Sequence, residues 1–272
     1  MNIKYIITLV AFIFLSGCAT SPTGRSQLML VSPDEAISAS KQAYIQTLQP
    51  LAREGKIDSD QQVSERVRWI TGLIIGQAIG LYPNTANWDW SIKVIDDPTV
   101  VNAWCMAGGK MAIYTGLINK VKPTDDELAQ VLAHEISHAL ANHTAERMSV
   151  ALASQLGIMT VGIAASNSRY SGAALTGTAL AAALAIQLPN SRTAETEADV
   201  MGMELAARAG YNPYAAATLW QKMENVGGKG PVEFLSTHPA PVNRQTALTN
   251  LAPRYMYLYQ QTGVRPVYQF KN

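Results

Sequence analysis

The sequence predicts a mainly helical α+β fold with a small β-sheet, and three observations lead to this fold class. Helix formers follow N-terminal helix signals at residues 32–49 and 59–79. Apolar and polar residues then alternate over residues 88–94, which is the period of a strand with one buried face. Two more segments with helix-start signals follow, at residues 124–140 and 190–202.

The composition is that of a globular protein. The chain has 272 residues, of which 48% are hydrophobic and 15% charged, enough to bury a sizeable core in one or two domains. Its formal net charge is +1 and it has no long run of Lys or Arg. The composition therefore excludes a nucleic-acid-binding protein, which usually carries a basic patch.

The first residues have the pattern of a secretory signal peptide, which we predict at residues 1–17. Lys4 precedes an uncharged apolar run at residues 5–15 that is too short to span a bilayer. The run ends in LSGC, which resembles the bacterial lipobox. That resemblance implies lipidation of Cys18; the alternative is an ordinary signal peptide with an incidental cysteine. Ala19 rather than Asp follows, which implies an anchor in the outer membrane of a Gram-negative cell, on its periplasmic side.

The mature chain is predicted to consist of a lipid tether, residues 18–31, and a single domain, residues 32–272. The tether is small, polar and interrupted by Pro22 and Gly24. Lipidation of Cys18 would leave Cys105 as the other cysteine, so no intramolecular disulfide is expected. Cys105 is interpreted as a small buried hydrophobe rather than a reactive thiol.

The predicted sheet continues after residue 94 with strands at residues 100–106 and 111–115. Gly108 and Gly109 stand between these strands and suit a hairpin turn, because glycine adopts positive φ without a steric penalty. Further along, residues 150–188 are rich in Ala, Gly, Leu and Ile. Their apolar run, residues 173–188, is short for a bilayer span, so buried or lid-like helices are predicted.

A helix with two histidines one turn apart follows the sheet. Thr124 and Glu127 form a capping box, so the helix is expected to begin there. On this helix His134 and His138 are four residues apart and project on the same side, with Glu135 beside them.

This His-Glu-x-x-His pattern suits zinc. Two neutral imidazoles can bind one Zn²⁺, while the carboxylate of Glu135 is close enough to take a proton from the metal's water. The alternative is two surface histidines on an ordinary helix.

A third ligand would favour the zinc site, and the remaining residues limit the choice. The metzincin pattern needs glycine at position 141 and histidine at position 144, but the chain has Ala141 and Thr144. Glu195 and Asp199 lie four apart on the later helix. Glu195 can complete a His₂Glu site while Asp199 accepts a hydrogen bond from a ligand imidazole. Glu197 points to another side of that helix and is expected to be solvated.

Three motifs together resemble one family. HEISHALANHTAERMS, SRTAETEAD and STHPAPVNR, within residues 90–250, are similar to the HtpX and CAAX-prenyl-protease family of gluzincin metallopeptidases, especially its periplasmic lipoprotein members. The resemblance implies one Zn²⁺ per chain, held by His134, His138 and Glu195, with Glu135 as the base. It also implies that residues 102–116 form the strand pair beside the active helix. Trp104 and Cys105 depart from the smaller or aliphatic residues expected there.

Two residues of the third motif are further candidates. His238 could stabilise a tetrahedral oxyanion, occupy the open zinc position as a fourth ligand, or act as a latch; the alternative is a surface histidine before Pro239. Arg244 is a second oxyanion candidate, or a structural ion-pair partner. His143 is placed badly for the same ion and is assigned a structural role.

The sequence thus predicts a zinc endopeptidase that cleaves misfolded or misassembled envelope proteins. An exposed edge of the small sheet could bind polypeptide substrates as an added strand, unless both edges are covered. The first alternative is a zinc-stabilised chaperone or assembly factor for outer-membrane proteins, working with the envelope assembly machinery. The second is a structural envelope lipoprotein without metal.

Overall fold

The computed structural model describes residues 18–164, 190–227, 232–239 and 243–271, with side chains omitted for residues 156–164. It divides the chain into two compact units. One contains Met1–Ala39 and Asn142–Leu188, and the other Ser40–Ala141 and Pro189–Asn272. The predicted tether and single domain stay predictions.

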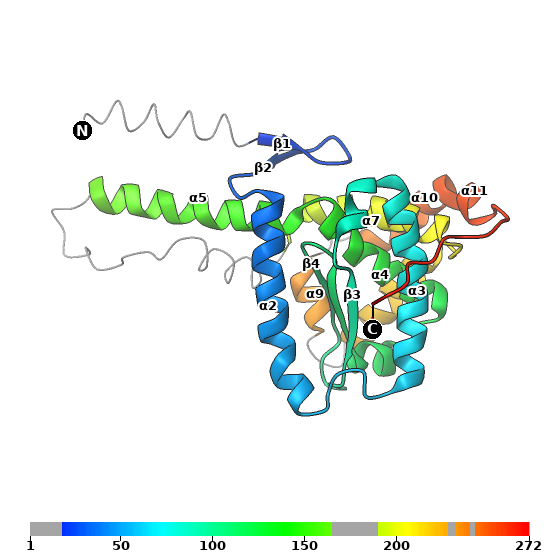
Figure 1. Ribbon diagram of the computed structural model, residues 1–272. Helices are drawn as coiled ribbons and strands as arrows, with labels where there is room; N and C mark the ends of the chain where they lie inside the picture. Colours follow the sequence, from blue (N-terminus) through cyan, green and yellow to red (C-terminus); the bar gives the residue numbers. More distant parts are fainter. Residues whose placement is uncertain (1–17, 165–189, 228–231, 240–242, 272) are drawn as a thin grey trace. The chain divides into compact units, whose positions relative to one another are not determined.

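The larger unit is mainly helical, as predicted, with one three-stranded sheet (Figure 1). Its long helices are α3 (Gln61–Leu81), α4 (Asp125–Leu140), α7 (Arg192–Arg208) and α8 (Ala215–Gly227), together with most of α2 (Pro33–Arg53). Its short helices are η1 (Pro83–Asn87), the π-helical turn η2 (Leu117–Val121), α9 (Glu233–Thr237), α10 (Arg244–Leu251), η3 (Ala252–Tyr255) and α11 (Met256–Tyr259).

The sheet contains β3 (Ser91–Ile95), β4 (Ala103–Met106) and β5 (Lys110–Tyr114). All three predicted strands exist, although the first two begin three residues later than expected. The order is β3-β5-β4: β5 pairs with β4 in an antiparallel and with β3 in a parallel arrangement. Gly108 and Gly109, with φ of 76° and 77°, form the predicted turn.

Buried apolar side chains of the sheet and of four long helices form one core. Alternation in β3 buries Ile92 and Val94 on one face, as the sequence pattern predicts. Ile70 and Ile74 of α3 and Leu132 of α4 join them, each no more than 1% exposed. The sheet and α3 thus hold α4 on a rigid apolar base, which fixes the polar residues that α4 carries.

The two helices that carry the predicted ligands begin where their caps predict. Thr124 and Glu127 form both hydrogen bonds of the capping box at the start of α4. The Ser191 hydroxyl caps α7 by accepting from the amide of Ala194. Each cap satisfies amides that have no partner within the helix, so the first turns are fixed.

The described part of the smaller unit contains a hairpin and a long helix. The hairpin consists of β1 (Cys18–Thr20) and β2 (Ser26–Leu28), and it lies within the segment predicted as a tether. The guanidinium of Arg25 donates two hydrogen bonds of 2.6 Å to the carboxylate of Glu146 on α5 (His143–Ala164). This bidentate pair ties the hairpin to α5.

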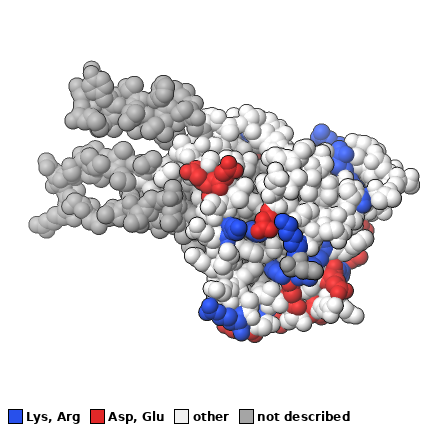
Figure 2. Space-filling view, viewed as in Figure 1, with Lys and Arg blue, Asp and Glu red and all other residues white. Residues whose placement is uncertain are grey.

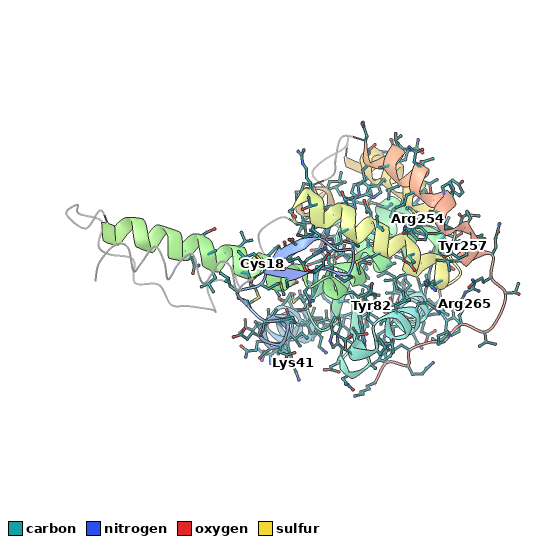
Figure 3. The ribbon with its side chains drawn as sticks, turned by 90° about the horizontal axis from the view of Figure 1, so that it is seen from above. Cys18, Lys41, Tyr82, Arg254, Tyr257 and Arg265 are labelled. Atoms are coloured by element: carbon teal, nitrogen blue, oxygen red, sulfur yellow. The ribbon has the colours of Figure 1, made fainter. Side chains whose placement is uncertain are left out.

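The predicted signal peptide, residues 1–17, and the apolar run at residues 173–188 lie outside the described residues. Within the described part of the chain, none of the helices combines the length and the apolar character that a bilayer crossing requires. Cys18, the predicted lipidation site, is exposed at the start of β1 (Figure 3).

Candidate metal centre

Helix α4 presents its two histidines together inside the larger unit. His134 and His138 are 5% and 2% exposed, and their Nε2 atoms lie 3.0 Å apart. Glu135, between them in sequence, is 2% exposed. These burials exclude the alternative of two surface histidines on an ordinary helix.

Helix α7 brings Glu195 to the same point. Its Oε2 lies 3.3 Å from Nε2 of His134, and its Oε1 lies 3.4 Å from Nε2 of His138. The Glu195 side chain has no exposed area. Two segments about sixty residues apart in the sequence therefore meet at this point.

A glycine sets the distance between α4 and α7. A Cβ atom built on Gly202 would lie 2.9 Å from both the N and Cα atoms of His134. Only glycine therefore lets α7 approach the backbone of α4 this closely at the histidine. Gly202 fixes the separation between the imidazole pair and Glu195.

Asp199 orients His134. Nδ1 of His134 lies 3.1 Å from Oδ1 of Asp199, so Nδ1–H donates to the carboxylate and the lone pair of Nε2 faces the cluster. Burial opposes protonation of His134, but Asp199 and Glu195 outweigh it and raise its pKa to about 9. Burial likewise opposes the charged form of Glu195, yet His138 and His134 hold its pKa well below the usual range. Zinc has to displace a proton to bind here.

Arg244 faces the two carboxylates of α7. Its Nη1 donates to Oε2 of Glu195 at 3.1 Å and its Nη2 to Oδ1 of Asp199 at 2.5 Å. The guanidinium carbon lies 3.9 Å from the ring centroid of Trp220, and the residue is 4% exposed. Of the two predicted roles, these contacts fit the structural ion-pair partner.

His238 completes a group of four potential ligands. One ligand atom from each of His134, His138, Glu195 and His238 lies within 4.8 Å of the others. Nδ1 of His238 lies 3.1 Å from the carbonyl oxygen of Phe234, and the two rings stack with centroids 4.2 Å apart. Nε2 of His238 lies 3.2 Å from Oε1 of Glu135. His238 is 4% exposed, which excludes the surface alternative.

The donor set fits zinc. Tetrahedral Zn²⁺ with bonds of about 2.1 Å separates its ligand atoms by roughly 3.4 Å, close to the distances around Glu195. Oε1 of Glu195 and Oε1 of Glu135 are buried and make no hydrogen bond among the described residues, although an imidazole nitrogen lies 3.4 Å from the first and 3.2 Å from the second. Buried carboxylate oxygens without donors are costly unless a cation satisfies them. The cluster of His134, His138, Glu195 and His238 therefore suits one Zn²⁺.

One expectation about this region is wrong. Glu197 is 4% exposed, not solvated, because α7 contacts α3 and α11 as well as α4 and has little free surface. Cys105 is buried, as predicted, and burial followed by the charge of Glu135 raises the pKa of its thiol well above the usual value. His143 is buried in the smaller unit and is not part of the cluster, in keeping with its structural assignment.

Three residues that support the cluster are not predicted by the sequence pattern. Phe234 stacks on His238, Trp220 stacks on Arg244, and Gly202 sets the approach of α7 to α4. The one signal that could have pointed to Gly202 is its place within a helical pattern. Glycine lowers helix stability there, so its presence usually has a packing reason. The aromatic residues carry no such signal because their partners lie on other elements.

A buried His₂Glu cluster with a neighbouring glutamate, built on two helices beside a small sheet, defines the metallopeptidase class. The sequence model of peptidase family M48 matches residues 64–252. The chain belongs to this family, whose members use zinc, and the match begins earlier than the resemblance seen in the sequence motifs.

Named relatives support the family assignment. The mitochondrial metalloendopeptidase OMA1 of Saccharomyces cerevisiae is 35% identical over 181 residues, 64% of this chain and 50% of its own. The metalloendopeptidase OMA1 of Bos taurus is 31% identical over 268 residues, 95% of this chain and 50% of its own. The beta-barrel assembly-enhancing protease of Escherichia coli is 31% identical over 159 residues, 56% of this chain and 32% of its own. The chain thus spans about half or less of the length of these relatives.

Proposed function

We propose that the protein is a zinc-dependent endopeptidase that cleaves misfolded or misassembled polypeptides of the bacterial cell envelope. The observation that carries the proposal is the buried cluster of His134, His138 and Glu195 with Glu135 beside it. Membership of a peptidase family and relatives named metalloendopeptidases support the same activity.

Each residue of the cluster has a distinct part in this proposal. His134, His138 and Glu195 would hold the ion, which lowers the pKa of a water towards about 7 and polarises the peptide carbonyl. Glu135 takes the proton of the attacking water and passes it to the leaving amine. Asp199 keeps His134 in the tautomer that leaves Nε2 free of a proton, and Arg244 holds Asp199 and Glu195 in place.

His238 has two chemically distinct roles open to it. Its Nε2 reaches the cluster, where it can act as a fourth ligand and block water, or share the charge of the oxyanion. His238→Ala separates these roles: peptidase activity rises if the histidine is a latch and falls if it stabilises the oxyanion. An unchanged rate would assign His238 to neither.

The edge of β4 is the proposed position of the scissile peptide. The amide of Tyr114 donates to the carbonyl of Asn102, so the backbone groups of Ala103 and Cys105 point away from β5. The start of this edge is partly covered, because the Phe234 amide donates to the carbonyl of Val101. Strand β4 contacts α4, which carries Glu135, and the charge of Glu135 contributes to the raised pKa of the Cys105 thiol. An extended substrate added at Cys105 would therefore pass beside the proposed base.

Glu135→Gln tests the proposal against the chaperone alternative. The amide keeps the shape of the side chain but cannot take a proton, so zinc binding should persist while cleavage of unfolded casein is lost. Zinc content is measured by metal analysis and cleavage by release of labelled fragments, with Glu195→Ala as the control that loses zinc. Casein cleavage retained by Glu135→Gln would refute the role of Glu135. Full cellular function without cleavage would favour the chaperone.

We also propose that the protein is anchored by lipid on the periplasmic side of the outer membrane. The LSGC sequence before Ala19 and the exposed position of Cys18 support this location. The name of the Escherichia coli relative supports work beside the β-barrel assembly machinery. Cys18→Ala should abolish incorporation of labelled palmitate and release the protein from sedimented outer membranes. Labelling that persists in this variant would refute the anchor.

A further inference from the structure

A groove of about 500 Å³ lies on the larger unit and shares none of its lining residues with the metal cluster. Its walls are β3, α3 and the C-terminal segment, defined here as residues 267–271. Its volume is in the range of built ligand sites. On the face shown in Figure 2, Lys and Arg side chains lie near the C-terminal end of the chain that Figure 1 marks, with Asp and Glu side chains among them.

One wall of the groove is a sheet edge whose hydrogen-bonding groups point into it. The Ser91 amide donates to the carbonyl of Gly109 beside β5, so the groups of Ser91 and Lys93 face β5. The backbone amide and carbonyl groups of Ile92 and Val94 face away from β5, because alternate residues of a parallel strand form hydrogen bonds on opposite sides. Within the described residues, the amide and carbonyl of Ile92 have no hydrogen-bond partner outside the sheet. An extended backbone matches this donor and acceptor pair.

The chain already uses the same edge to bind an extended segment. The Asp58 amide donates to the carbonyl of Val94, and the Val94 amide donates to the carboxylate of Asp58. Ile57 and Ile95 form an isolated antiparallel bridge. Asp58 then turns away with φ of 53°. The groove at Ile92 is the continuation of this strand position, left open where residues 56–58 depart from the edge.

The other walls are held in place before any ligand arrives. The Tyr268 amide donates to the carbonyl of Gly72 on α3, where a Cβ atom would lie 2.8 Å from the Tyr268 carbonyl oxygen. Arg265, labelled in Figure 3, donates to the carbonyl of Arg208 and so ties the chain just before the C-terminal segment to α7. Trp69 of α3 lines the groove and is 60% exposed, which makes it a large apolar contact for an occupant.

The charges around the groove favour an acidic occupant. Among its lining residues Arg68, Lys93 and Lys271 are cationic, while Glu65 is the one carboxylate. Nη2 of Arg68 and Nζ of Lys93 lie 2.6 and 2.8 Å from the same oxygen of Asp58, so two cations pair with one carboxylate there. Their side chains remain 40% and 34% exposed, which leaves them accessible to carboxylates of a bound chain.

We propose that this groove is an exosite that binds an extended, acidic segment of a polypeptide substrate as an added strand on β3. The proposal rests on the proposed peptidase function. The β4 edge beside Glu135 and the β3 edge lie on opposite sides of β5, about 10 Å apart across the sheet. A long substrate can occupy both edges, whereas a peptide of about six residues that binds as a strand along β4 has no further residues with which to reach β3.

Two substrates and two matched pairs of variants test the exosite. The substrates are unfolded casein, which is long and acidic, and a fluorogenic hexapeptide taken from a mapped casein cleavage site. Trp69→Ala and Lys271→Glu alter the groove. Tyr257→Ala, which removes another aromatic residue that is 60% exposed (Figure 3), and Lys120→Glu are the controls. Each groove variant should raise KM for casein about fivefold or more, with kcat unchanged and hexapeptide kinetics as in the wild type.

Binding of labelled casein to Glu135→Gln separates the exosite from the peptidase reaction. If Trp69→Ala weakens this binding but the wild type cleaves neither substrate, the result supports the exosite and refutes the proposed peptidase reaction. If cleavage occurs and the groove variants behave as their controls do, the exosite is refuted. Equal losses on casein and hexapeptide would also refute it, because they indicate a general structural effect. A dimer in light scattering that Trp69→Ala dissociates would assign the groove to a second copy of the chain instead.

Discussion

Replacing Gly202 with alanine tests whether the contact between α4 and α7 sets the geometry of the metal centre. In an ordinary helix the change would stabilise the protein by about 1 kcal/mol, because glycine is a poor helix former. Here the new methyl group would lie 2.9 Å from the backbone of His134, closer than real Cβ contacts, so the helices have to separate by a few tenths of an ångström. Overpacking of this kind costs about 1–3 kcal/mol.

We therefore expect a net loss of about 1 kcal/mol in the free energy of unfolding for Gly202→Ala. Because metal ligands tolerate displacements of only about 0.2 Å, zinc affinity should fall about tenfold or more. Gly80→Ala is the matched control, since a Cβ atom at this position near the end of α3 meets nothing within 4 Å. Gly80→Ala should leave zinc affinity unchanged and raise stability by up to about 1 kcal/mol.

Urea unfolding of the zinc-free and zinc-loaded protein measures the stabilities, and competition with a chromogenic chelator measures the zinc affinity. If Gly202→Ala raises the urea midpoint as Gly80→Ala does, with zinc affinity unchanged, the inferred close packing at His134 is wrong.

Two further predictions concern buried charges and ionisation. Arg244→Met should destabilise the zinc-free protein by about 3 kcal/mol, because Glu195 and Asp199 would lose their cation in a buried site. Zinc should restore part of this loss in thermal unfolding; equal losses with and without zinc would contradict the ion-pair role. Burial raises the pKa of Tyr44 from 10.0 to about 12, so the folded state keeps a proton that the unfolded chain releases. The stability that this proton contributes is fully present below about pH 10 and is lost as the pH rises towards 12. Tyr44→Phe should flatten this alkaline decline in urea midpoints, and a profile parallel to the wild type would contradict the assignment.

The sequence by itself determined the local features that depend on neighbouring residues. The capping box at Thr124 and Glu127 fixed where α4 begins, since its two hydrogen bonds join residues three apart. The helical repeat then placed His134 and His138 on one side. The glycine pair at 108 and 109 and the alternation before residue 95 likewise predicted the hairpin and the buried face of β3.

The spacing of the residues and the number of ligands that zinc needs also predicted much of the metal centre. A zinc site needs a third ligand, and Glu195 was the carboxylate on a second helix that could supply it together with Asp199. What spacing could not provide was the distance between the two helices, because that distance depends on packing at Gly202 and on the apolar base beneath α4.

The tertiary structure alone decided the environment of each charge. Helical angles suggested that Glu197 faces solvent, but packing on several sides of α7 buries it. Arg244 could have faced an oxyanion or a carboxylate from its place in the sequence, and the fold sets it against Glu195 and Asp199 over Trp220. The order β3-β5-β4 gives the sheet its two edges, one beside Glu135 and one along the groove. Burial and long-range pairing depend on many contacts between residues far apart in the sequence, so a local sequence pattern does not predict them.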